Sequence, residues 1–234
     1  MPVEYARLST RALEELASKQ NVIAVIPLGS IEQHCEGPLG LDSMIAERLS
    51  QEACRRLEAR GEVTCVILPT LNYGYSPEWG RVKGTISIPL HTYAELLEAV
   101  VEGAIGSGFR RIALINAHGG NVGVAEAVLR SIASRHEGVV LALINYWELL
   151  NAKLDHAGPF EEAVVRALGF NIDLGECASV GYEGKPRILL RTPREPSKIT
   201  MGVTGVSLDL EALVEALAGA LRRVATVDPL GYSI

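Results

Sequence analysis

The sequence has no apolar run as long as the roughly 18 residues that a membrane-spanning helix needs. Its N-terminal stretch, MPVEYARLST, also lacks the basic and apolar regions of a signal peptide. Its cysteines, Cys35, Cys54, Cys65 and Cys177, form no CxxC pair, which argues against a thiolate metal site and favours a reducing compartment. We therefore expect a cytoplasmic protein in which most cysteines serve as packing residues.

An excess of positive charge is also missing. The 22 Lys and Arg residues are outnumbered by 28 Asp and Glu residues, which gives a formal net charge of -6, and they form no long basic block. This balance argues against a general electrostatic attraction to nucleic acid or to an anionic membrane surface. A small molecule is the better default partner.

The hydrophobic content is sufficient for a single core. At 234 residues and 48% hydrophobic residues, we expect one domain that spans residues 1–234. Apolar β-branched runs alternate with segments of helical periodicity, which predicts an α/β fold with a parallel sheet between helical layers. The expected strands are Asn21–Leu28, Glu62–Leu68, Arg111–Ile115 and Gly138–Asn145, with shorter extended segments at Thr85–Ile88, Cys177–Tyr182 and Arg187–Arg191. The expected helices are Thr10–Lys19, Ser43–Ala59, His91–Ile105 (with Leu96, Leu97, Val100 and Val101 facing inward), Val122–His136, Phe160–Leu168 and Leu208–Val224.

Three potential metal ligands follow the first expected strand. Glu32 and His34 are two residues apart, so in an extended backbone their side chains project to the same side. Asp42 lies at the mouth of the next helix, where a carboxylate is favoured and one oxygen remains free to bridge two metals; Ser43 beside it is an alternative helix cap. Carboxylate and imidazole ligands suit zinc, manganese or ferrous iron. The spacing alone fits equally well with a capping Asp42 and a solvated Glu32 and His34.

Two further clusters carry candidate catalytic groups. His118 follows a strand, and the backbone N–H groups of Gly119, Gly120 and Asn121 open a helix where an anionic oxygen could bind, although an isolated histidine at a strand end is often a packing residue. In the stretch LDHAGPFEEA, His156 is a candidate proton carrier, and Glu161 or Glu162 offers a carboxylate. The alternative is a helix start with acidic residues in its first turn.

A long loop with aromatic residues is a candidate lid. Residues 71–84, LNYGYSPEWGRVKG, carry Ser76 and Trp79, which we take as candidate substrate contacts together with Trp147 after the last expected strand. An exposed tryptophan serves a subunit interface equally well, and this alternative stays open for Trp79.

The motifs GSIEQH with LD, GTISI, NAHGGN and HAGPFE occur in an order and spacing that resemble the creatininase family, over roughly residues 27–162, with a weaker echo at GVTG. The resemblance implies a three-layer αβα sandwich, a dinuclear metal centre, hydrolysis of amide C–N bonds other than ordinary peptide bonds, and assembly into homo-oligomers, possibly hexamers. In the family pattern Glu32, His34, Asp42 and His118 match metal ligands, with Asp42 bridging. His156 matches the histidine implicated in proton transfer.

Several departures from the family pattern concern the ligands and the substrate pocket. Creatininases place a carboxylate ligand where this chain has Gly120, so we assign Glu161 as its nearest replacement, in metal binding and catalysis. The turn between His34 and Asp42 is one residue shorter, and Cys35, either a thiolate ligand or a small buried side chain, replaces a glycine; we favour the second role. Two further changes place Trp79 at a family histidine and Glu162-Ala163 at a family Thr-Ser pair. The tryptophan that covers creatinine is missing from residues 151–155, which makes creatinine an unlikely substrate.

The favoured interpretation is a metal-dependent amidohydrolase with two divalent ions, zinc, iron or manganese. Water would attack the amide, and His156 would protonate the leaving nitrogen. Among branches of the family, the formylamino-pyrimidine ribotide deformylase fits the HGGN motif best, and Arg81, Lys83 and residues 185–187 are candidate phosphate contacts. The alternatives are a family hydrolase of a lactam or a modified peptide, and a non-catalytic homologue that binds a metal or a ligand.

Overall fold

The computed structural model describes residues 2–150, 152, 155–175 and 208–227. Its centre is a sheet of strands β1 (Val3–Glu4), β2 (Val22–Leu28), β3 (Thr64–Ile67), β4 (Arg111–Asn116) and β5 (Val140–Asn145), in the order β1-β3-β2-β4-β5. All four strand pairings are parallel. The α/β architecture predicted from alternating periodicities is therefore confirmed.

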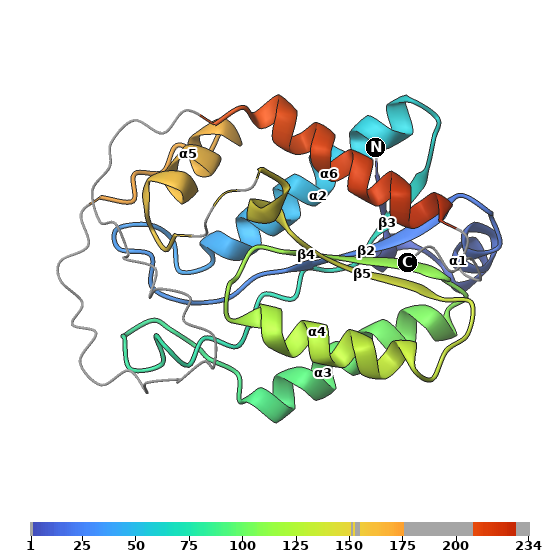
Figure 1. The fold of residues 1–234 in the computed structure, drawn as a ribbon, viewed down its shortest axis with the longest axis horizontal. Helices are drawn as coiled ribbons and strands as arrows, with labels where there is room; N and C mark the ends of the chain where they lie inside the picture. Colours follow the sequence, from blue (N-terminus) through green and yellow to red (C-terminus); the bar gives the residue numbers. More distant parts are fainter. Residues whose placement is uncertain (1, 151, 153–154, 176–207, 228–234) are drawn as a thin grey trace.

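Helices cover both faces of this sheet (Figure 1). On one face lie α2 (Leu41–Ala59), α5 (Pro159–Ala167) and α6 (Leu210–Thr226), and on the other α1 (Thr10–Ala17), α3 (Leu90–Gly106) and α4 (Asn121–Ala133). Short 3-10 turns occur at Tyr5–Arg7 and Tyr146–Leu150. The three-layer sandwich expected from the family resemblance is thus present.

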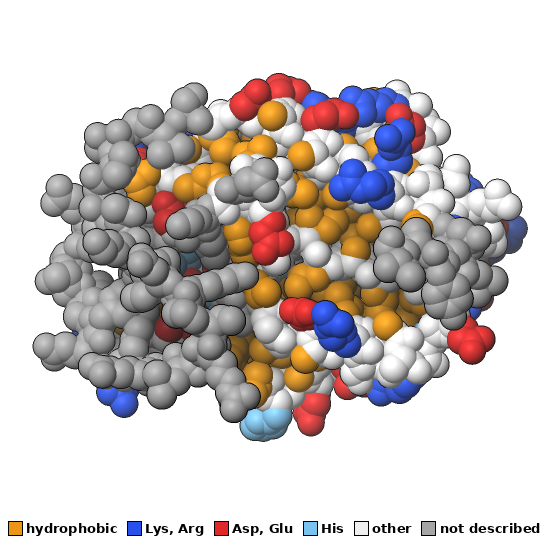
Figure 2. All heavy atoms as spheres, in the orientation of Figure 1, with side chains coloured by type: hydrophobic (Ala, Val, Ile, Leu, Met, Phe, Trp, Pro, Cys, Tyr) orange, Lys and Arg blue, Asp and Glu red, His pale blue; other side chains and the backbone are white. Residues whose placement is uncertain are grey.

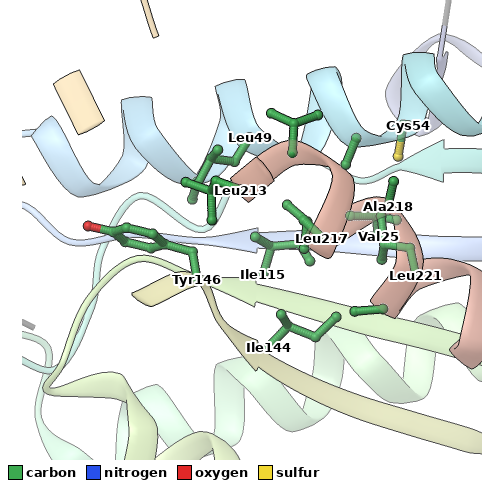
Figure 3. Packing of buried hydrophobic residues seen from close by; sticks show 14 of the residues in the cluster. Val25, Leu49, Cys54, Ile115, Ile144, Tyr146, Leu213, Leu217, Ala218 and Leu221 are labelled. Carbon is green, nitrogen blue, oxygen red and sulfur yellow. The ribbon is translucent and has the colours of Figure 1, made fainter. Parts of the chain in front are cut away.

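Alternate residues of the central strands supply the two cores, as the period-two geometry of a strand requires. Val25 and Ile115 point toward α2 and α6, and Figure 3 shows Ile115 beside Leu217 and Val25 beside Ala218. The neighbouring residue Ala24 belongs to the core beneath α3 and α4. Because β2 is buried along its whole length, its apolar sequence carries no polar alternation.

The pairing register sets where the loops emerge. Leu28 at the end of β2 pairs with Asn116 at the end of β4, so the carboxyl ends of these two central strands are level. The loops that follow them therefore leave the sheet side by side, at the edge where open α/β sheets bind ligands.

The structure corrects several local expectations. Leu96 is 40% exposed rather than inward-facing, because Leu97 and Val101 already fill the inner face of α3. Residues 85–88 form no strand, although the amide of Ile86 donates to the Ile31 carbonyl. Strand β5 is an edge strand with half-buried residues rather than a fully covered one, and Figure 2 shows apolar side chains across the middle of the face on which it lies.

The remaining expectations have different outcomes. The short strand β1 pairs with β3 and was not predicted. The strands expected at residues 177–182 and 187–191 lie outside the described residues. In the part of the chain that the structure describes, no helix has the length and apolar character needed to cross a bilayer.

Candidate metal centre

The structure brings the predicted ligands together from four separate segments. Glu32 and His34 follow β2, Asp42 lies in the first turn of α2, His118 follows β4, and Glu161 lies in the first turn of α5. Each of these five residues is at most 3% exposed. Charged groups are rarely buried so completely unless they are paired or coordinate a metal, so the cluster is a candidate metal centre.

Asp42 lies between two histidines. Its Oδ1 is 3.2 Å from His34 Nε2, and its Oδ2 is 3.1 Å from His118 Nδ1. The hydroxyl of Ser30 donates to Oδ2 over 2.7 Å and fixes the orientation of the carboxylate. The two oxygens of Asp42 thus face two different imidazoles, although the turn between His34 and Asp42 is short.

The expected capping role is absent. Gly40 is the N-cap of α2, and no side chain makes a capping hydrogen bond there. The Ser43 hydroxyl instead donates to the Ser30 carbonyl. The capping alternative for Asp42 and Ser43 was therefore wrong, because both side chains turn toward the loop after β2.

Backbone carbonyls fix which nitrogen of each histidine faces the cluster. His34 Nδ1 lies 3.1 Å from the Glu32 carbonyl, and His118 Nε2 lies 3.0 Å from the Tyr75 carbonyl. A carbonyl only accepts, so these two nitrogens carry hydrogen. The opposite nitrogens, Nε2 of His34 and Nδ1 of His118, therefore point at carboxylates, in the arrangement typical of metal-binding histidines.

The start of α5 positions Glu161. Asp155 accepts hydrogen bonds from the amides of Phe160 and Glu161, which orients the first turn of the helix. The amide of Ala157 donates to Glu161 Oε2 over 2.6 Å, while Oε1 lies 3.7 Å from His34 Nε2. Glu161 therefore completes a group with His34 and Asp42.

His156 lies over the cluster. Its Nε2 is 2.8 Å from both the backbone carbonyl and the side-chain amide nitrogen of Gln33, and its Nδ1 is 3.3 Å from Glu32 Oε1. The indole of Trp79 stacks on the imidazole with ring centroids 4.2 Å apart. Because Trp79 is only 7% exposed and contacts His156, the structure favours a place in the site over the subunit-interface alternative.

The charges of the cluster shift the pKa values of its members. Burial alone would lower the pKa of His34, but the carboxylates of Asp42 and Glu161 outweigh it and raise that pKa to about 10. Burial raises the pKa of Glu161 to about 8. Burial and the neighbouring His34 lower the pKa of His156 to about 3, so this imidazole is neutral at physiological pH.

The donor set fits divalent cations. Three groups have ligand atoms that all lie within 4.8 Å of one another: Glu32, His34 and His156; Glu32, Glu78 and His118; and His34, Asp42 and Glu161. The second oxygen of Glu32, Oε2, is buried and has no hydrogen-bond partner among the described residues. A buried carboxylate oxygen left unpaired is costly, and a cation would satisfy it.

The cluster has two sides, named after their histidines. The His34 side consists of His34, Glu161 and Asp42 Oδ1. The His118 side consists of Glu32, His118 and Asp42 Oδ2.

Glu78 was missed by the sequence reasoning. It lies in the loop 71–84, part-buried, with a carboxylate oxygen near Glu32 and His118. The signal in the sequence was its place directly before Trp79, which stands where the family pattern has a histidine.

The predicted substrate contacts are placed differently. Asn121 is fully buried, and its amide donates to the Gly29 carbonyl and accepts from the Tyr75 amide, so it holds loops together instead of facing a substrate. Its backbone N–H is directed to the His118 carbonyl. Trp147 is packed in the hydrophobic core, edge-on to Tyr146. For Asn121 and Trp147 the expectation of substrate contact is therefore corrected.

Ser76 and the two glycines also have defined positions. The hydroxyl of Ser76 is fully buried, 3.0 Å from His118 Nε2, so it contacts the histidine. Gly119 is exposed, and Gly120 packs so closely that a Cβ there would lie 2.0 Å from the Tyr75 carbonyl oxygen. No side chain fits at residue 120 with the loop in this position.

Cys35 has a different role from either expected one. It forms a disulfide, and its φ of 57° lies in the left-handed region where a glycine would be favoured. Cys54 and Cys65 are free and buried, as expected of packing residues. The remaining cysteine, Cys177, lies outside the described residues. Cys35 is therefore neither a thiolate ligand nor an unpaired packing residue.

Comparisons with known proteins match a family model and several curated relatives. The family model described as creatinine amidohydrolase matches residues 6–170. A 3-dehydro-scyllo-inosose hydrolase of Thermotoga maritima is 23% identical over 154 residues, which cover 64% of this chain and 48% of that protein. A mycofactocin precursor peptide peptidase of Mycobacterium tuberculosis is 38% identical over 104 residues, covering 42% of this chain and 41% of that protein. The match thus spans about half the length of these curated relatives.

Solved structures show the same fold. A solved structure described as "Creatininase Mn" superposes on this chain with a TM-score of 0.72. The two are 18% identical, and the match covers 97% of this chain and 100% of that chain. A mutant creatininase of Zn-Zn type gives a TM-score of 0.71 at 18% identity, with the same coverage. The two central loops described above therefore leave a sheet of known architecture.

Proposed function

Because the chain belongs to the creatininase family, we propose that it is a metal-dependent hydrolase that breaks an amide C–N bond of a small molecule. The observation that carries this proposal is the position of Asp42, whose two oxygens face His34 and His118 inside a buried cluster of carboxylates. A bridging carboxylate between two sets of ligands is the arrangement that a dinuclear centre requires.

The two sides of the cluster would each hold one ion. His34, Asp42 and Glu161 form the first set, and Glu32 and His118 join the other oxygen of Asp42 in the second. Divalent zinc, manganese or iron ions bound there would activate a water molecule at neutral pH and polarise the amide carbonyl. In the neutral histidines, the ring nitrogens that face the cluster carry no hydrogen and can act as ligands.

His156 would move the proton. In the tautomer that donates its Nε2–H to the Gln33 carbonyl, Nδ1 would face the cluster as a proton acceptor. This nitrogen would take a proton from the attacking water and pass it to the leaving nitrogen as the C–N bond breaks. Trp79 stacks on the imidazole and would restrict its movement and its access to solvent.

A formamide is the proposed substrate class, as in formylamino-pyrimidine ribotide deformylase; hydrolysis would release formate and an amine. The HGGN motif supports this branch. The exposed Arg81 and Lys83 lie on the same loop as Trp79 and are available for a phosphate group. Residues 185–187, the other candidate contacts, lie outside the described residues.

A peptide substrate is the second candidate. It is favoured by the relative that is 38% identical over 104 residues, whose name is a precursor peptide peptidase. The same ligands and the same His156 would serve a peptide bond, because the bond broken is again an amide C–N bond. The difference would lie in the groups that bind the rest of the substrate.

A substrate screen with metal-reconstituted protein tests these proposals. Wild-type chain and His118→Ala would be incubated with formamides, lactams and short peptides, and formate and new amines would be measured. We expect formate release from the wild type and loss of both metal and turnover in His118→Ala. Peptide cleavage without formate release would select the second candidate. Fewer than two ions and no turnover would instead support the non-catalytic homologue.

Sedimentation of the same sample would test the predicted homo-oligomer.

A further inference from the structure

Each side of the cluster has three fixed ligand groups, one fewer than the four of a closed tetrahedral site. The fixed members of the His118 side are Glu32, His118 and one oxygen of Asp42, and the position where creatininases carry a further carboxylate is Gly120. A side chain at residue 120 is excluded, since its Cβ would lie 2.0 Å from the Tyr75 carbonyl oxygen and 2.5 Å from His118 Nε2. Glu161, the replacement expected from the sequence, lies on the His34 side, so a fourth ligand of the His118 side would come from another segment.

We propose that Glu78 supplies this ligand, so that the loop 71–84 completes the metal centre. Its carboxylate oxygen and the ligand atoms of Glu32 and His118 all lie within 4.8 Å of one another. Bonds of about 2.0–2.2 Å from zinc to oxygen or nitrogen place two ligands of one ion roughly 3 to 4.4 Å apart. The three atoms therefore need only a small inward movement to share one ion. This inference rests on the proposed metal-dependent function.

The loop is anchored so that Glu78 faces the cluster. On one side of it, the Tyr75 carbonyl and the Ser76 hydroxyl both contact His118 Nε2. On the other side, Trp79 stacks on His156. The amide of Trp79 donates to the Ser76 carbonyl, which closes a turn around Glu78. The Tyr75 carbonyl fills the space beside Gly120. It therefore belongs to the same loop that carries Glu78, the proposed ligand.

Charge balance supports the assignment. Glu32 and Glu78 are two carboxylates that meet in one small group, and the Oε2 atom of Glu32 has no hydrogen-bond partner among the described residues. With Asp42 and Glu161, the centre then has four carboxylates, which would balance the charge of two divalent ions when the histidines are neutral. Without an ion, the neighbouring carboxylates repel one another.

Metal binding by the full chain tests the proposal without reference to turnover. Chelator-stripped protein would be titrated with Mn²⁺, and free Mn²⁺ would be followed by electron paramagnetic resonance. We expect two ions in the wild type. In Glu78→Gln the ion on the His118 side should bind at least about tenfold more weakly, since even residues that only support a ligand change metal affinity 10–100-fold. Glu78→Asp, with a shorter side chain, should give an intermediate affinity.

Two controls separate a ligand from a structural residue. Glu95→Gln removes an exposed carboxylate from α3 and should bind both ions like the wild type. Without metal, Glu78→Gln should melt at the same temperature as the wild type or higher, because it removes one of two neighbouring carboxylates. With Mn²⁺ it should gain less thermal stability than the wild type. A lower melting temperature of the metal-free variant would show that Glu78 is structural and overturn the proposal.

The outcomes distinguish this inference from the proposed function. A wild-type chain that binds fewer than two ions would overturn the dinuclear centre, whatever the variant does. A wild-type chain with two ions, together with a Glu78→Gln variant of unchanged affinity, would overturn the role of Glu78 and leave the dinuclear centre intact.

Discussion

The two sides of the cluster are built from different kinds of structure. On the His34 side, Asp42 and Glu161 lie in the first turns of α2 and α5, and the Ala157 amide holds Glu161. On the His118 side, the imidazole is held through Tyr75 and Ser76, which belong to the long loop 71–84. One side therefore takes its geometry from helix ends, whereas the other depends on how a loop packs. We expect the ion on the His118 side to exchange faster.

Asp42→Ala should have the largest effect on metal binding and turnover, because Asp42 contributes to both sides of the cluster. Removing the shared carboxylate takes one ligand from each ion, and we expect both ions to be lost and turnover to fall by more than about a thousandfold. Elemental analysis and a rate assay on the same sample measure this. Asp42→Asn preserves the shape and should lose metal without unfolding. Two ions retained in either variant would contradict the bridging role.

His156→Ala should separate chemistry from metal binding. Since its proposed role is proton transfer, we expect both ions to remain and the rate to fall by about 100- to 10,000-fold. The matched control is His136→Ala, which removes a histidine that pairs with Glu102 away from the cluster. A loss of metal in His156→Ala would instead make this residue a ligand, as its place beside Glu32 and His34 allows.

Ser30→Ala should weaken metal binding on the His118 side more than on the His34 side. The Ser30 hydroxyl donates only to Oδ2 of Asp42, the oxygen that faces His118. We expect the affinity for the ion on the His118 side to fall by about 10- to 100-fold, with a smaller change on the His34 side. Calorimetric titration that resolves two binding phases measures this. Ser50→Ala, which removes a buried hydroxyl bonded to Ala46 within α2, is the control and should change neither phase.

Metal binding should release protons on both sides of the cluster, because Asp42 and Glu32 outweigh burial and also raise the pKa of His118 well above its usual value. In the metal-free cluster the pKa of His34 is raised to about 10 and that of Glu161 to about 8, so both hold protons at pH 7. An ion must displace them, and its apparent affinity should rise with pH by about tenfold per unit for each proton released, levelling off above pH 10. Titration in buffers of different ionisation enthalpy counts these protons. A pH-independent affinity would contradict the protonated metal-free site.

The sequence was sufficient for the sheet and for most of the cluster. Strand β2 was recognisable because an unbroken apolar run is typical of a strand that is buried on both faces, and β4 for the same reason. Once two such strands are parallel, their carboxyl ends lie together, so the pairing of His34 with His118 across the cluster follows from topology. The positions of Glu32, Asp42 and Glu161 followed from motif spacing.

What the sequence could not predict depends on tertiary packing. Glu78 lies in a loop whose path is set by contacts with His118 and His156, and no local periodicity describes such a path. For the same reason Asn121 was expected to face a substrate, although its amide is committed to Gly29 and Tyr75. Leu96 was misplaced because α3 is apolar over much of its surface, so its inner face is decided by contact with the sheet.

The tight packing of Tyr75 against Gly120 limits how this centre could be redesigned. Introducing glutamate at residue 120 would force the loop outward, because the new Cβ has no room beside the Tyr75 carbonyl. Moving the loop would withdraw Glu78, the ligand proposed above, so a glutamate at residue 120 and a bound Glu78 would exclude each other. A single substitution therefore cannot convert this chain to the creatininase arrangement. Such an exchange requires a coordinated change at residue 120 and in the loop 71–84.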